Sequence, residues 1–251
     1  MKVLVVGAGK MVESILAGLP ADAISPWGIV SKSGVSAKNL ANMFGMQFVE
    51  KVEDFQADWI LLGCKPQQLK EIKIPNVPVM SLLAAISEQT QKEILKVTHL
   101  VRVMPNLPVK HKSGVILLSS SSKQHLKMPE ELFSKLGLTK IMDEKELEEL
   151  TLLTGSGPAL FYEFAKTLAE SFKSLSESER EVMVKAVLQG SAASLNESSL
   201  QSMIDAVTSK GGVTIAVLEE WRKKDLGEVL KSGIVAGEKR TDELKAHLLQ
   251  N

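Results

Sequence analysis

The chain opens with the stretch KVLVVGAGKMVESILAG, which covers residues 2–18. Its apolar run over residues 2–6 is typical of a strand buried on both faces of a parallel sheet. The spacing over residues 10–19 predicts a helix, which Pro20 ends. Between them lies Gly7-Ala8-Gly9, where one glycine permits a tight turn and the next lets the backbone approach a pyrophosphate. The stretch therefore predicts a dinucleotide-binding fold, with a plain two-glycine turn as the alternative.

Strand-like and helical patterns continue to alternate after this stretch. Further strands are expected at residues 27–30, 47–49, 58–64, 77–83 and 100–104, and a helix at residues 36–44. Such alternation predicts right-handed βαβ units and a parallel sheet. Residues 113–118 and 138–142 are expected to add edge strands, with a helix at 129–136 between them. The predicted fold class is therefore α/β, with an N-terminal Rossmann-like domain.

Helical spacing dominates from Lys145 to the end of the sequence. Helices are expected at residues 160–172, 179–195, 200–207, 214–223 and 226–248. Pro158, which follows Gly155-Ser156-Gly157, is expected to lie in the first turn of a helix. We place a domain boundary near residue 150, so that residues 1–150 bind NAD(P) and residues 151–251 form an all-α domain. Some of its helices are apolar or small on more than one face, which predicts a dimer interface.

Composition excludes several classes of function. The 251 residues include 30 basic and 30 acidic side chains, a balance that argues against nucleic acid or an anionic membrane as the main partner. Cys64 is the single cysteine, so no internal disulfide is possible and a reducing compartment is expected. The four histidines lack the spacing of a metal site, and no metal is expected. No apolar run approaches a membrane span of about 20 residues, so a soluble, cytoplasmic protein is expected.

The end of the second predicted strand bears on cofactor choice. It reads Ser31-Lys32-Ser33, without the acidic residue that holds the ribose 2′-hydroxyl in sites that prefer NAD. Lys32 can accept a 2′-phosphate instead, which predicts NADPH as the preferred cofactor, with NADH possible. The alternative is that Lys32 is a solvated surface lysine.

Three further segments lie where ligands bind in such folds. Cys64-Lys65-Pro66-Gln67 and Met104-Pro105-Asn106-Leu107-Pro108 each follow a predicted strand, although each can also be a turn stiffened by proline. Ser209-Lys210-Gly211-Gly212-Val213-Thr214 leads into a helix, and its successive N–H groups can form a concavity for a small carboxylate. An ordinary helix N-cap after a flexible loop is the alternative for this last segment.

Together these residues resemble the pyrroline-5-carboxylate reductase family, and the resemblance runs over nearly the whole length. The motifs in register are Gly7-x-Gly9-x-Met11, Lys65-Pro66-Gln67, Arg102-Val103-Met104-Pro105-Asn106-x-Pro108, Gly155-Ser156-Gly157-Pro158-Ala159 and Val207-Thr208-Ser209-Lys210-Gly211-Gly212-x-Thr214. The resemblance implies a Rossmann-like domain and a helical domain that interlocks in a homodimer or higher homo-oligomer. It implies NAD(P)H-dependent reduction of 1-pyrroline-5-carboxylate, a cyclic imine, to L-proline, a step of proline biosynthesis.

The resemblance also implies roles for individual residues. Thr214 would hydrogen-bond the ring nitrogen of the substrate and relay a proton, and the backbone at Gly212 to Thr214 would hold its carboxylate. The implied substrate-binding residues are Ser209, Gly211, Gly212, Val213 and Thr214. The implied cofactor-binding residues are Val6, Gly7, Ala8, Gly9, Lys10, Met11, Ser31, Lys32, Ser33, Cys64, Lys65, Pro66, Ala84 and Asn106, the last beside the nicotinamide.

Several positions depart from the family pattern and mark a divergent member. Val12 stands where a small residue packs the helix on the strand, and Ala84-Ala85 where Ala-Gly is usual. Lys210 replaces a frequent proline and Val213 a small or hydroxyl residue, both beside the predicted carboxylate site. Two alternatives therefore stay open: a reductase of a different cyclic imine, and an NADPH-binding paralogue with a regulatory role. A β-hydroxyacid dehydrogenase fits less well, because Lys166 lies too far beyond Gly155-Ser156-Gly157 to be its catalytic lysine.

Overall fold

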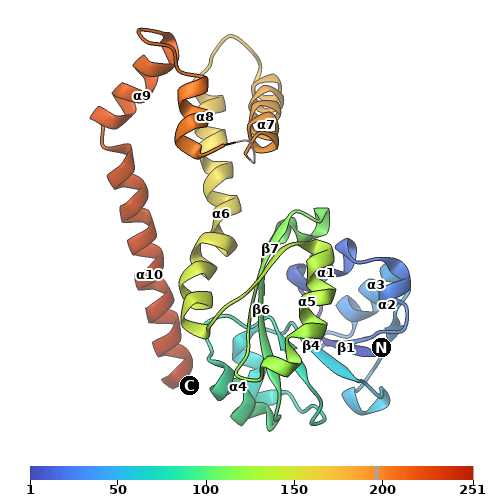
Figure 1. Cartoon of the computed structure of the whole chain (residues 1–251). Helices are drawn as coiled ribbons and strands as arrows, with labels where there is room; N and C mark the ends of the chain where they lie inside the picture. Colours follow the sequence, from blue (N-terminus) through green and yellow to red (C-terminus); the bar gives the residue numbers. More distant parts are fainter. Residues whose placement is uncertain (196–197, 251) are drawn as a thin grey trace. The chain divides into compact units, whose positions relative to one another are not determined.

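A computed structural model describes residues 1–195 and 198–250, with side chains up to residue 246 (Figure 1). Residues 196, 197 and 251 of the predicted helical domain lie outside the described residues. The chain divides into two compact units: unit 1 comprises Met1–Pro158 and Arg240–Asn251, and unit 2 comprises Ala159–Lys239. The sequence-based division at residue 150 differs from these units mainly at the C-terminus, which belongs to unit 1.

Unit 1 is built on an eight-stranded sheet in the order β3-β2-β1-β4-β5-β6-β7-β8. The strands are β1 (Val3–Val6), β2 (Gly28–Val30), β3 (Gln47–Phe48), β4 (Trp59–Leu62), β5 (Val79–Ser81), β6 (Leu100–Pro105), β7 (Gly114–Ser119) and β8 (Gly137–Ile141). All neighbours pair in parallel except β6 and β7. The first six strands have the order of a dinucleotide-binding sheet, so the predicted α/β class is confirmed.

The helices of unit 1 cover both faces of this sheet. They are α1 (Lys10–Gly18), α2 (Ala21–Ile24), α3 (Val35–Phe44), α4 (Glu88–Leu95) and α5 (Lys127–Phe133), with 3-10 turns η1 (Val52–Asp54), η2 (Pro66–Glu71), η3 (Leu107–His111), η4 (Lys123–His125) and η5 (Ser134–Leu136). Along β1, Val3 and Val5 pack into one core cluster and Leu4 and Val6 into the other. Because alternate side chains point to opposite faces, a strand between two cores must be apolar throughout, as residues 2–6 are.

Helix α6 corrects one expectation. It runs without a break over Glu144–Glu170, with Pro158 inside it, so the prediction that Gly155-Ser156-Gly157-Pro158 starts a helix is wrong. Proline has no N–H, and the carbonyl one turn earlier, that of Thr154, therefore lacks its helical donor. Asn106 Nδ2 donates to this carbonyl at 3.0 Å. A side chain from another element thus supplies the missing hydrogen bond, which sequence spacing could not reveal.

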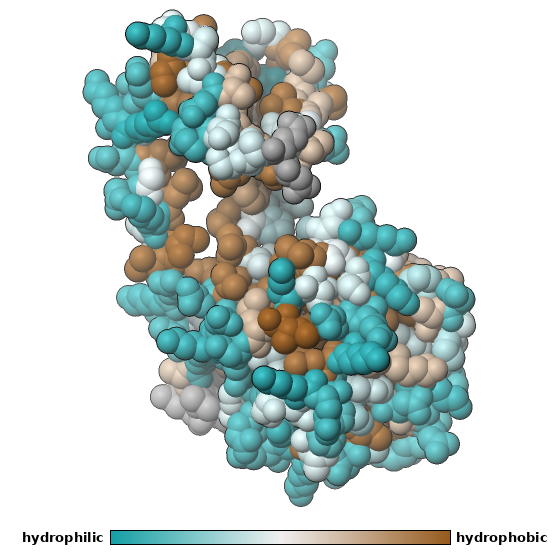
Figure 2. All heavy atoms as spheres, in the orientation of Figure 1, coloured by the Kyte–Doolittle hydropathy of each residue, from teal (hydrophilic) through white to brown (hydrophobic). Residues whose placement is uncertain are grey.

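Unit 2 contains the second half of α6 together with α7 (Glu177–Ala193), α8 (Leu200–Ala206), α9 (Val213–Lys223) and part of α10 (Leu226–Gln250). Among its described residues only Ala169 is buried. Large apolar side chains are exposed along its helices, among them Phe161, Tyr162, Val182, Met183, Val187, Leu200 and Val229. Figure 2 shows brown, hydrophobic atoms on the visible surface of these helices. None of the described helices is long and apolar enough to cross a membrane.

Candidate functional site

A cavity of about 1000 Å³ lies in unit 1, beyond the carboxyl ends of β1, β2 and β4. This edge of a parallel sheet is where ligands of such folds bind. The predicted cofactor residues that line it are Val6, Gly7, Ala8, Gly9, Ser31, Lys32, Ser33, Cys64 and Lys65. Lys10, Met11, Pro66, Ala84 and Asn106 are not among its lining residues. Sequence reasoning missed a further set of lining residues that carry no motif: Glu50, Lys51, Val52, Glu53, Gln68, Glu71, Ile72 and Lys73.

The two glycines of the first turn have different physical roles. Gly7 has φ 116°, and a Cβ there would lie 2.5 Å from the carbonyl carbon of Gly63, so the fold itself requires glycine. Gly9 has φ −87°, and a Cβ there would meet no atom within 4 Å. Gly9 is the N-cap of α1, where no side chain caps the free N–H groups. The open space beside them fits a pyrophosphate, which the helix N-terminus favours electrostatically.

Val12 on α1 packs closely against the end of β4, because the residue that faces it there, Gly63, has no side chain. Val12 is fully buried, and a Cβ on Gly63, just after β4, would overlap its Cγ2 atom. In the usual pattern a small residue on the helix permits this close packing. Here Gly63 permits it instead, so the departure at Val12 preserves the geometry of the turn.

The residues after β2 form a polar corner of the cavity. The Ser31 hydroxyl is buried and has no hydrogen-bond partner among the described residues. Lys32 Nζ lies 2.8 Å from Glu71 Oε2, and both side chains are largely exposed. Ser33 Oγ and Ser36 Oγ are 3.0 Å apart. A 2′-phosphate would find hydroxyl and ammonium donors here, so the residues fit an NADP-type cofactor.

The Cys64 thiol lines the same cavity without being reactive. Burial raises its pKa to about 11, partly opposed by a backbone hydrogen bond. The group is therefore a neutral thiol near pH 7, and it contributes shape rather than a nucleophile.

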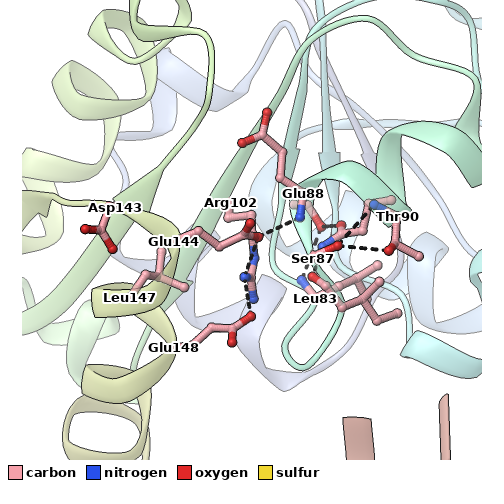
Figure 3. Close-up of polar contacts among 12 residues, drawn as sticks. Leu83, Ser87, Glu88, Thr90, Arg102, Asp143, Glu144, Leu147 and Glu148 are labelled. Atoms are coloured by element: carbon pink, nitrogen blue, oxygen red, sulfur yellow. Dashed lines mark hydrogen bonds and ion pairs between the residues drawn. The ribbon is translucent and has the colours of Figure 1, made fainter. Parts of the chain in front are cut away.

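The motif Arg102 to Asn106 ties β6 to neighbouring helices rather than lining the cavity. Arg102 is almost fully buried and donates to Glu144 at 2.7 Å and to Glu148 at 2.9 Å (Figure 3). Glu144 Oε1 also accepts the backbone N–H of Glu88, the first residue of α4. Burial acts to raise the pKa of Glu148, but hydrogen bonds from Lys245 and Arg102 hold it below its ordinary value. The cluster is thus an ion network that joins β6, α4 and α6.

Asn106 uses both ends of its amide in unit 1. Its Oδ1 accepts from the backbone N–H of Val115 at 2.9 Å, while its Nδ2 donates to Thr154. The side chain is buried. Its structural role is clear, and its predicted place beside the nicotinamide stays a prediction.

The loop between β5 and α4 contains a second departure from the family pattern, at Ala85. Ala85 has φ 62°, a left-handed conformation that glycine adopts at little cost and alanine does not. Buried Gln91 holds the loop, since its Nε2 donates to the Ile86 carbonyl at 2.7 Å and its Oε1 accepts from Ser81. Ala84, the predicted cofactor contact, is exposed at the tip of this loop.

The glycine segment of unit 2 leads into a helix, as expected. Gly211 has φ 71°, Gly212 is the N-cap of α9, and no side chain caps the first turn. The Gly212 N–H donates to the Ser209 carbonyl at 3.0 Å, which closes the loop against the helix end. The structure thus brings Ser209, Gly211, Gly212, Val213 and Thr214 together at one helix N-terminus. Val213 and Thr214 are exposed, and the binding roles of all five residues stay predictions.

Comparisons with known proteins agree with this arrangement over the full length. Residues 144–244 match the model of the pyrroline-5-carboxylate reductase dimerisation domain. The pyrroline-5-carboxylate reductase of Pisum sativum is 27% identical over 95% of this chain and 94% of its own. That of Aquifex aeolicus is 29% identical over 89% and 90%.

Solved structures give the same result. The 1-pyrroline-5-carboxylate reductase of Streptococcus pyogenes is 27% identical and superposes with a TM-score of 0.84, covering 98% of both chains. The NADP-bound pyrroline carboxylate reductase of Plasmodium falciparum, at 20% identity, shares the fold with a TM-score of 0.82 over 98% of both chains. In sequence and in fold, this chain belongs to the pyrroline-5-carboxylate reductase family.

Proposed function

We propose that this protein reduces 1-pyrroline-5-carboxylate to L-proline with NADPH, as a step of proline biosynthesis. The observation that carries the proposal is the full-length likeness to reductases of this substrate. The polar corner at Ser31 and Lys32 supports a 2′-phosphorylated cofactor, and the Plasmodium falciparum relative binds NADP. The cytoplasmic location expected from the lack of a long apolar run stays a prediction.

The chemistry asks little of the side chains of this chain. Reduction adds a hydride to the imine carbon and a proton to the ring nitrogen, and bound NADPH would supply the hydride. The free N–H groups at the start of α9 would hold the substrate carboxylate, and Lys210 would add positive charge beside them. The Thr214 hydroxyl would hold the ring nitrogen and pass the proton. Placement and exclusion of water then account for most of the catalysis, which fits motifs without a histidine or carboxylate dyad.

We also propose that the active form is a homodimer, or a higher homo-oligomer, joined through the helices of unit 2. The exposed apolar side chains of unit 2 and its match to a dimerisation domain support this assembly. Light scattering of the purified protein should give a mass of at least two chains, and a monomer at micromolar concentration would contradict the proposal.

The reaction is tested directly with purified protein, NADPH and pyrroline-5-carboxylate, by following absorbance of the reduced cofactor and proline formed. We expect oxidation of NADPH only when the imine is present, with one proline formed for each NADPH. NADPH binding without turnover would favour the regulatory paralogue. Turnover of a six-membered cyclic imine carboxylate, but not of pyrroline-5-carboxylate, would favour a reductase of a different substrate.

The role of Thr214 has its own test. Thr214→Val keeps the shape but removes the hydroxyl, and we expect kcat/KM to fall by about 10²-fold or more with NADPH affinity nearly unchanged. Thr214→Ser retains the hydroxyl and should recover most of the activity. Thr208→Val is the matched control, because the Thr208 hydroxyl bonds the Ile204 carbonyl one turn earlier. Unaltered turnover in Thr214→Val would exclude the proposed proton relay.

A further inference from the structure

One ion pair joins two separate elements that line the cofactor cavity. Lys32 follows β2, and Glu71 ends η2, the 3-10 turn that follows β4. Lys32 Nζ and Glu71 Oε2 are 2.8 Å apart, although 39 residues separate them in sequence. The lysine predicted to recognise the 2′-phosphate therefore already has an anionic partner inside the cavity.

Lys32 and Glu71 differ from the other charged residues of the cavity in being paired. The charged residues that line it are Lys32, Glu50, Lys51, Glu53, Lys65, Glu71 and Lys73. Among the described residues of this set, Lys32 and Glu71 form a salt bridge and the other five do not. Glu71 thus differs from Glu53, which carries the same charge in the same cavity but forms no salt bridge with a described lysine.

The pair affects the two nicotinamide cofactors differently. A 2′-phosphate carries about two negative charges and needs the ammonium of Lys32, so it competes with Glu71 and is repelled by it. The ribose of NADH carries a neutral hydroxyl at this position and leaves the pair intact. The buried Ser31 hydroxyl, which has no partner among the described residues, lies in the same corner and can serve either ligand.

We propose that Glu71 is a specificity-determining residue: by holding Lys32 it lowers the preference for NADPH and keeps NADH a competent cofactor. The inference rests on the proposed use of a nicotinamide cofactor at this cavity, and it adds a residue that the dinucleotide motif does not contain. Because the Lys32 and Glu71 side chains are 72% and 61% exposed, the effect is modest. We expect about a three- to tenfold change in relative affinity.

The test measures dissociation constants of NADPH and NADH by calorimetry, without substrate, for the full-length protein. Glu71→Gln should bind NADPH about three- to tenfold more tightly, with NADH changed by less than about twofold. Lys32→Gln should weaken NADPH selectively. In the double variant Lys32→Gln/Glu71→Gln, the gain from the Glu71 substitution should disappear. Glu53→Gln makes the same charge change in the same cavity and should leave the ratio of the two constants nearly unchanged.

The possible outcomes separate the explanations. Equal effects of Glu71→Gln on both cofactors would overturn the inference, and so would an equal shift of the ratio in Glu53→Gln, which would indicate a general charge effect. A gain that persists without Lys32 would show that Glu71 does not act by holding the lysine. If both cofactors bind as expected but pyrroline-5-carboxylate is not reduced, the proposed reaction fails and the inference about Glu71 stands. If neither cofactor binds, both are wrong.

Discussion

Unit 1 and unit 2 differ in how they bury apolar side chains. Unit 1 has cores on both faces of its sheet, and β1 contributes fully or almost fully buried residues to each. Each such side chain contributes roughly 1.5–3 kcal/mol relative to an exposed one. Unit 2 buries only Ala169 among its described residues. Unit 1 therefore holds itself together, whereas the helices of unit 2 need another surface to cover them.

The largest expected effect is on self-association, and one matched pair of substitutions compares the two units. Met183 on α7 in unit 2 and Met43 on α3 in unit 1 are 60% and 64% exposed. Met183→Lys should weaken self-association at least tenfold, because it places an unpaired charge in an apolar interface. Met43→Lys should leave association unchanged. Equal behaviour of the two variants in sedimentation at several concentrations would mean that the exposed face of α7 is not an interface.

A smaller effect is expected inside unit 1, at the contact between Gly63 and Val12. Gly63→Ala should destabilise unit 1 by about 1–3 kcal/mol, since the added methyl group overlaps Val12 in a closely packed core. Val12→Ala in the same chain makes room and should recover part of that loss. Urea unfolding of the single and double variants measures the coupling. Additive losses would show that the two residues do not share one packing constraint.

A still smaller effect, and of opposite sign, is expected at Ala85. Its φ of 62° is left-handed, so Ala85→Gly relieves strain of about 1–2 kcal/mol while loosening the unfolded chain. A net stabilisation of about 0.5–1 kcal/mol is expected in unit 1, with no change in association of unit 2. Lys112, at the end of η3 and away from the cofactor cavity, also has a positive φ, 56°. Lys112→Gly is therefore the control for the general effect of placing glycine at a left-handed position. If Ala85→Gly instead destabilised unit 1, the inference that the backbone at Ala85 is strained would be wrong.

The smallest effect is a pH dependence within unit 1. The rings of His99 and His125 stack with centroids 3.9 Å apart, and Trp59 meets His125 edge-on. Burial first, and then the charge of His99, lowers the pKa of His125 below its ordinary value of 6.5. The unfolded chain then binds the proton more tightly than the folded one, so stability is retained above 6.5 and declines as the pH falls below it.

The measurement compares urea midpoints near neutral pH and in mild acid for the wild type and His125→Phe. The phenylalanine ring can stack on His99 but cannot gain a proton, so the variant should lose less stability in acid. An identical acid response in both proteins would assign the pH dependence to other groups.

Much of the α/β architecture could be predicted because its cause is local. The alternation of apolar runs with helical spacing placed every strand of the sheet within a few residues, and the glycine turn predicted part of the cavity lining. The lining residues from positions 50–53 and 68–73 could not be predicted, because they belong to no motif and meet the glycine turn only after folding. The role of Arg102 was missed for a related reason: its partners Glu144 and Glu148 are more than forty residues away.

The sequence by itself determined the succession of the strands, the turn at Gly7-Ala8-Gly9 and the loop at Gly211-Gly212, since backbone conformation and apolar period are properties of neighbouring residues. Only the tertiary structure decided how the departures from the family are accommodated. Val12 is tolerated because Gly63 lies opposite, and Pro158 lies inside α6 because Asn106 supplies a hydrogen bond to Thr154. The pairing of Lys32 with Glu71 also depends on folding. In each case the deciding contact joins residues far apart in sequence, which no local pattern records.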